Sequence, residues 1–177
     1  MTAAFAATVV TLPLATAAIA AVYLRQYRVG PRARRAAVGV HFLSVTAIIG
    51  TYSLLCLTEY RTTAWMVVGW AVFAAGSVVF WYAVRSHPTC LVPDDQQGVV
   101  SAGPYSRIRH PIYSGGLLGA LGLLGVAPSW RVAVAWLVLA ACMGVLLAIE
   151  ERELLARFGA RYAQYRRDTD LLIPGVL

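Results

Sequence analysis

Charged residues are scarce in this chain: Asp, Glu, Lys and Arg together make up 13% of its 177 residues. A soluble domain carries about 25%. Hydrophobic residues account for 59% of the chain, and the mean hydropathy is +0.67. The shortage of charge excludes an ordinary soluble domain and predicts an all-α integral membrane protein.

Cysteine and histidine are equally sparse, with three of each. Because Cys56, Cys90 and Cys142 form no C-x-x-C pair, neither a disulfide framework nor a metal site is implied. The histidines at positions 41, 87 and 110 also lack metal-ligand spacing. His41 lies inside an apolar segment and is interpreted as a packed, hydrogen-bonded side chain. No metal is expected.

Five apolar segments can be recognised, at residues 3–24, 37–57, 64–84, 112–127 and 131–149. Each is near the ~20 residues that span a hydrocarbon core, so we expect about five transmembrane helices. A cleaved signal peptide is the alternative for the first segment, but no basic residue precedes Arg25, and a signal needs a positively charged start. We expect a single domain over residues 1–177, with three spans in 1–84 and a loop, a C-terminal helical hairpin and a tail in 85–177.

Lysine is absent, so all 15 basic residues are arginines, and their positions determine the predicted topology. Only Arg61 and Arg131 lie in the loops on one side. By the positive-inside rule, the N-terminus is expected outside and the C-terminus in the cytoplasm. The plasma membrane of a bacterium is the expected location. The thirteen arginines on the cytoplasmic side are Arg25, Arg28, Arg32, Arg34, Arg35, Arg85, Arg107, Arg109, Arg152, Arg157, Arg161, Arg166 and Arg167.

The net charge of +7 does not indicate a nucleic-acid partner. The arginines are dispersed through short juxtamembrane loops, and no soluble domain presents them as one surface. Topology and the anionic headgroups of the lipid bilayer explain them better. The oligomeric state is left open.

Polar residues are concentrated in two clusters at the ends of apolar runs. The first is G-P-Y-S-R-I-R-H-P-I-Y-S-G at residues 103–115, and the second runs from Glu150 to Tyr165. Pro111 suits the first turn of a helix, where its missing N–H costs nothing. His110 would then lie at the helix entrance, where free amides and the helix dipole favour an anionic group such as a carboxylate.

The two clusters bracket the helical hairpin. Its short connection, residues 127–130, makes the two helices antiparallel and places His110 and Glu150 at nearly the same membrane depth. Small residues recur at helical spacing in both helices, and we expect these faces to pack on each other. They are Gly115, Gly119 and Gly122 in the first helix and Ala140, Gly144 and Ala148 in the second.

Glu151 follows Ala148 by three positions, so it is expected on the same packed face, beside His110 and Tyr113. Apolar and aromatic residues then recur at three- and four-residue spacing among arginines, which predicts one amphipathic helix at the cytoplasmic interface. These residues are Leu154, Phe158, Tyr162 and Tyr165.

The two clusters resemble the isoprenylcysteine carboxyl methyltransferase family and its phospholipid methyltransferase relatives. The hallmarks of that family are R-H-P-x-Y-x-G followed by E-E-x-x-L-x-x-x-F-G-x-x-Y-x-x-Y, and both are present here in that order, within residues 91–174. The resemblance implies methyl transfer from S-adenosylmethionine to a lipophilic acceptor, with the loop before the hairpin binding the cofactor. A soluble cofactor of this kind is available on the cytoplasmic side.

Site residues are carried over from the resemblance position by position. Arg109 and Glu151 are expected to orient the acceptor and stabilise its reactive form. The expected cofactor-binding residues are His110, Pro111, Tyr113, Gly115 and Glu150, with Tyr105, Tyr162 and Tyr165 lining the pocket. Simpler interpretations remain open: Arg107 and Arg109 as topology anchors, the glutamates as helix-end charges, and the tyrosines as interfacial aromatics.

The acceptor and the reaction class each have alternatives. Prenylcysteine enzymes usually carry a basic residue shortly before the two glutamates, whereas residues 146–149 are all apolar here, which disfavours a prenylcysteine carboxylate. A hydroxyl, carboxyl, thiol or amine acceptor stays open. A sterol-reductase-like membrane oxidoreductase typically has Asn after His-Pro, where this chain has Ile112. A transporter or non-enzymatic scaffold is disfavoured because the spans hold almost no charges.

The arginine asymmetry predicts that the hairpin connection lies outside the cell. A single cysteine introduced by Ser129→Cys into a chain lacking its three natural cysteines should react with an impermeant thiol reagent only from outside. Labelling only from the cytoplasmic side would overturn the topology and, with it, access of the cluster to a cytosolic cofactor.

Overall fold

A computed structural model describes residues 2–25, 31–87 and 98–175 of the chain. The helices are α1 (Ala3–Arg25), α2 (Pro31–Thr58), α3 (Trp65–Ser86), a 3-10 turn η1 (Gly103–Ser106), α4 (Pro111–Val126), α5 (Trp130–Phe158) and α6 (Ala160–Asp168). The interpretations of Arg28 and Cys90 fall outside the described residues. The interpretations of Arg25, Arg32, Arg34, Arg35 and His41 concern side chains that the structure does not describe.

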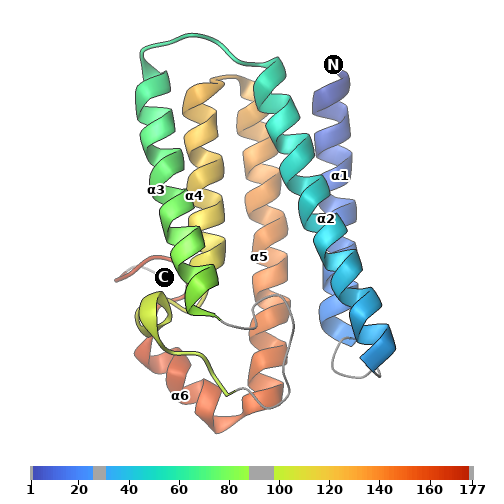
Figure 1. Ribbon diagram of the computed structural model, residues 1–177, viewed down its shortest axis with the longest axis vertical. Helices are drawn as coiled ribbons and strands as arrows, with labels where there is room; N and C mark the ends of the chain where they lie inside the picture. Colours follow the sequence, from blue (N-terminus) through green and yellow to red (C-terminus); the bar gives the residue numbers. More distant parts are fainter. Residues whose placement is uncertain (1, 26–30, 88–97, 176–177) are drawn as a thin grey trace.

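The five long helices run alternately up and down, and α6 lies across the end at which α3, α5 and the loop before α4 meet (Figure 1). The described ranges contain no strand, only one isolated bridge between Ile108 and Asp170. Three helices are long and apolar enough to cross a membrane, namely α1 over Ala3–Val22, α3 and α5. The apolar part of α2, Leu43–Thr58, and α4 are shorter.

This all-helical arrangement is consistent with an α-helical membrane protein. Each predicted apolar segment lies in a helix of its own, while the number of spans stays a prediction. The end of α1, the start of α2, the end of α3 and the end of α5 all lie at the same end of the bundle (Figure 1). The arginine-rich segments are therefore on one side of the fold, as their order in the sequence predicts.

The closest helix contact joins α3 to α4 through glycines. A Cβ atom added at Gly76 would lie 2.3 Å from the backbone nitrogen of Gly119, and one added at Gly122 would lie 2.3 Å from that of Phe73. Gly115 is equally tight, with 2.5 Å to the nitrogen of Phe80. No side chain fits between these backbones, so glycine is required on both helices.

The predicted close packing of α4 on α5 through Gly119 and Gly144 is wrong. A Cβ at Gly144 would meet nothing within 4 Å, and the small face of α4 is occupied by α3 instead. The α4 and α5 helices are joined by larger groups: the indole nitrogen of Trp136 donates to the carbonyl of Leu117 at 3.2 Å. Small residues show that a face permits close approach, but they do not specify which neighbour approaches.

The end of the bundle opposite the arginines is held by a buried ion pair. Arg131, at the start of α5, contacts Glu59, after α2, at 2.9 Å, and Glu59 is 9% exposed. An apolar core lies nearby, where Phe5, Leu55 and Val132 join α1, α2 and α5. One of the two arginines on this side is thus neutralised within the fold.

Gly76→Ala should lower the free energy of unfolding by about 1–3 kcal/mol, the usual cost of overpacking. The matched variant Gly144→Ala should lose nothing and should gain up to about 1 kcal/mol from helix propensity. Thermal unfolding in detergent measures both. Equal stabilities of the two variants would mean that α3 and α4 do not touch at Gly76.

Candidate functional site

The R-H-P segment is held between the end of α3 and the C-terminal tail. Gly103 starts the preceding turn with φ +61°, a backbone conformation that favours glycine. A Cβ there would also lie 2.8 Å from the hydroxyl of Ser86, so a larger residue would clash. The backbone N–H groups of Arg109 and His110 donate to the carbonyls of Asp170 and Leu171, at 2.8 and 3.1 Å. Pro111 is the first residue of α4 and His110 its N-cap, as the sequence predicts.

Glu151 contacts four side chains. Its Oε1 receives the Tyr162 hydroxyl at 2.5 Å and lies 2.8 Å from Nε2 of His110 and 3.3 Å from Nε of Arg109. Its Oε2 lies 3.0 Å from Nε of Arg166. We call Arg109, His110, Glu151, Tyr162 and Arg166 the Glu151 cluster; Glu151 and Arg109 are largely buried in it, with side chains 13% and 11% exposed.

The second carboxylate lies on the other side of the imidazole. The Tyr113 hydroxyl donates to Oε2 of Glu150 at 2.9 Å, and Nδ1 of His110 lies 3.9 Å from the same oxygen. Glu151 is therefore beside His110 as expected, but Tyr113 bonds Glu150 rather than Glu151. Glu150 is the more accessible carboxylate, with 23% of its side chain exposed.

Arg109 also holds the end of α6. Its NH1 donates to the carbonyl of Arg166 at 3.0 Å and to that of Thr169. Both carbonyls are at the C-terminus of α6, where the helix dipole favours a positive charge. One guanidinium thus ties the R-H-P segment to both α5 and α6.

The predicted single amphipathic helix is broken in two. The α5 helix continues to Phe158, Gly159 adopts φ +53°, and α6 starts at Ala160. Leu154 and Phe158 therefore belong to α5, whereas Tyr162 and Tyr165 belong to α6. Gly159 is the physical reason, because its positive φ ends one helix and changes the chain direction.

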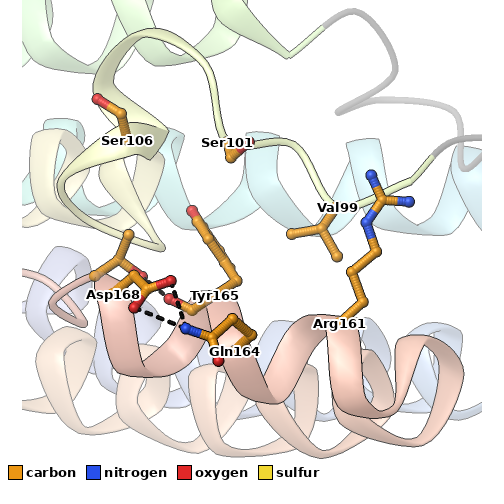
Figure 2. A pocket seen from close by; sticks show the side chains of 8 residues that line it. Val99, Ser101, Ser106, Arg161, Gln164, Tyr165 and Asp168 are labelled. Carbon is orange, nitrogen blue, oxygen red and sulfur yellow. Dashed lines mark hydrogen bonds between the residues drawn. The ribbon is translucent and has the colours of Figure 1, made fainter.

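The opposite side of α6 borders a pocket of about 320 Å³ beneath the loop that precedes η1 (Figure 2). The Tyr165 hydroxyl donates to the carbonyl of Tyr105 at 2.7 Å and joins α6 to η1. The pocket is lined by Val99, Ser101, Ser106, Arg161, Gln164, Tyr165, Asp168 and Thr169. It therefore lies on a different face of α6 from Glu151.

The two tyrosines of α6 act as hydrogen-bond donors. Burial, followed by the hydrogen bond to Glu151, raises the pKa of Tyr162 far above its ordinary value. Burial raises the pKa of Tyr165 to about 12, against an opposing effect of Arg109. Both phenols stay protonated at neutral pH. Tyr162 is 2% exposed, so it is not an interfacial belt residue.

The structure brings together six of the predicted site residues: Arg109, His110, Tyr113, Glu150, Glu151 and Tyr162. Pro111 and Gly115 are buried where α4 begins and packs on α3, and Tyr105 and Tyr165 form a separate contact nearby. Arg166 was missed, although it follows Tyr162 by four positions and so shares its helix face. The described part of the chain contains no group of three or more potential metal ligands.

Glu151→Gln should destabilise the fold, because it removes the only carboxylate that contacts the buried Arg109 among the residues that the structure describes. We expect a loss of about 3 kcal/mol, the lower end for breaking a buried ion pair. Glu153→Gln, two residues along α5, is the matched control and should change stability little. Thermal unfolding in detergent compares them, and indistinguishable midpoints would show that the cluster contributes nothing to stability.

The chain is 39% identical over 77 residues to the cobalt-zinc-cadmium resistance protein CzcN of Cupriavidus metallidurans, covering 43% of this chain and 35% of that protein. It is 36% identical over 72 residues to methanethiol S-methyltransferase 2 of Bradyrhizobium diazoefficiens, covering 40% of this chain and 26% of that protein. The chain thus spans about a third or less of the length of these relatives. No solved structure matches it.

Residues 64–161 match the phospholipid methyltransferase family. The match covers more than half of the chain and includes α3, α4 and α5 with Arg109, His110, Glu150 and Glu151. It confirms the resemblance drawn from the two sequence motifs, and the chain therefore belongs to the phospholipid methyltransferase family.

Proposed function

We propose that the protein transfers a methyl group from S-adenosylmethionine to a lipophilic acceptor at the cytoplasmic face of the membrane. The observation that carries the proposal is the contact of the two family motifs, in which His110 lies between Glu150 and Glu151 at 3.9 and 2.8 Å. Family membership supports methyl transfer. The arginine distribution supports the cytoplasmic face.

The donors and acceptors of the site fit a zwitterionic cofactor. S-adenosylmethionine carries a carboxylate and cationic groups. Glu151 already has four partners and is not free to receive a cation, whereas Glu150 has one hydrogen bond among the described residues and is partly accessible. Glu150 and Tyr113 therefore suit the cationic part, and the arginines around Glu151 suit the carboxylate.

The residues of the chain contribute binding and orientation. When bound, S-adenosylmethionine supplies an electrophilic methyl group on its sulfonium. Glu151 holds Arg109 and His110 in place. Nε and NH1 of Arg109 are already bonded, and its NH2 group, which has no partner among the described residues, orients an acceptor in this proposal. Orientation of two reactants can supply about 7–11 kcal/mol of a barrier. In this proposal Glu151 acts through its neighbours rather than on the reactants.

The acceptor is lipophilic, and a thiol is the first class to test. The methanethiol S-methyltransferase relative names a small apolar thiol, and the family name denotes phospholipids. The outer faces of α3 and α5 are apolar, with Trp81, Leu137 and Val145 exposed, as expected of helices that contact the lipid in which such an acceptor is dissolved. We therefore propose transfer to a thiol or to a lipid headgroup.

Calorimetric titration of the purified protein in detergent tests the proposal, with S-adenosylhomocysteine as the probe. The chain should bind it saturably and should not bind NADPH. Glu150→Gln should weaken binding at least ~10-fold, equal to about 1.4 kcal/mol, and Glu153→Gln should bind as wild type. Methyl transfer to methanethiol and to phospholipid vesicles then identifies the acceptor class. NADPH binding without S-adenosylhomocysteine binding would favour the oxidoreductase alternative.

A further inference from the structure

Arg166 differs from the exposed arginines around it because it is anchored at two points. Its Nε lies 3.0 Å from Oε2 of Glu151, and its backbone carbonyl accepts a hydrogen bond from Arg109 at 3.0 Å. Yet its side chain is 44% exposed. Its two terminal nitrogens have no partner among the residues that the structure describes. Four of the five N–H donors of a planar guanidinium are therefore available on a fixed support.

The charges of the Glu151 cluster do not balance. One carboxylate contacts two guanidinium groups, which leaves one positive charge in excess. Arg109 is 11% exposed, so the accessible part of this excess lies on Arg166. Glu150 supplies an accessible negative charge on the other side of His110. The cluster thus presents opposite charges on two sides of one imidazole.

We propose that Arg166 binds the amino-acid carboxylate of the methyl donor, while Glu150 faces the donor's cationic part. The proposal rests on the proposed function and names the ligand group that one residue recognises. A carboxylate offers two oxygens that match the parallel N–H groups of a guanidinium. Glu151 preorganises this contact, because it binds Nε of Arg166 and leaves the two terminal nitrogens available to a ligand.

The neighbouring arginines lack this combination. Among the described residues, the side chain of Arg167 bonds to Gln164, on the exposed side of α6. Arg161 lines the pocket beneath the loop before η1 (Figure 2). By helical spacing this is a different face of α6 from that of Tyr162 and Arg166, which contact Glu151. In the described part of the chain, neither Arg161 nor Arg167 shares a carboxylate with Arg109, as Arg166 does. Arg167 is therefore a matched control: the same residue type, one position along, without the anchor.

The terminal nitrogens of Arg166 would also suit the phosphate of a lipid headgroup. The test therefore distinguishes the carboxylate of the methyl donor from a headgroup phosphate. S-adenosylhomocysteine and its decarboxylated analogue are titrated into wild type, Arg166→Gln and Arg167→Gln in detergent. Each protein is also assayed for binding to phosphatidylglycerol vesicles. Arg166→Gln should weaken S-adenosylhomocysteine binding at least ~10-fold and decarboxylated-analogue binding less than about 2-fold. Arg167→Gln should behave as wild type with both ligands.

Three outcomes would overturn the assignment. In the first, Arg166→Gln weakens the binding of both ligands equally, which would make Arg166 a support of the fold. In the second, it changes the binding of neither ligand. In the third, it reduces vesicle binding alone, which would assign the Arg166 guanidinium to a headgroup phosphate. If Arg166→Gln does not fold, Arg166→Lys replaces it. This variant should bind S-adenosylhomocysteine only about 3-fold more tightly than the decarboxylated analogue. Wild type that binds neither ligand would instead refute the proposed function.

Discussion

The carboxylate of Glu151 joins four side chains that come from separate parts of the chain. Arg109 and His110 precede α4, Tyr162 and Arg166 belong to α6, and Glu151 itself is near the end of α5. Two guanidinium groups so close together would repel each other without an anion between them. This single negative charge therefore joins α6 and the start of α4 to α5, while backbone hydrogen bonds from Arg109 and His110 hold the tail.

Local rules of the sequence predict much of this site. Pro111 starts α4 because a proline at the first helical position needs no N–H partner, and His110 therefore occupies the N-cap position. Counting from the short connection at residues 127–130 places His110 level with the glutamates, and the structure puts Nε2 2.8 Å from Glu151. These predictions succeed because each rests on the regular rise of a helix or on one residue's backbone restriction.

Other features depend on which elements meet, and periodicity does not contain that information. The glycines of α4 face α3 rather than α5, since a smooth helix face can accept either neighbour. The pairing of Arg131 with Glu59 joins residues 72 positions apart. Arg166 looks like one arginine among several in a basic run, and only the fold shows that it shares a carboxylate with Arg109.

The length of α4 has a consequence for where chemistry occurs. Its 16 residues extend over about 24 Å, less than the ~30 Å thickness of a hydrocarbon core. If the short connection after Val126 lies at the outer surface, His110 stops about 6 Å below the inner edge of the core. The bilayer must then thin locally, or headgroups and water must dip inward to meet the helix start. A water-soluble molecule and a lipophilic molecule could thus meet at the start of α4, the first still partly in water and the second still partly in the hydrocarbon core.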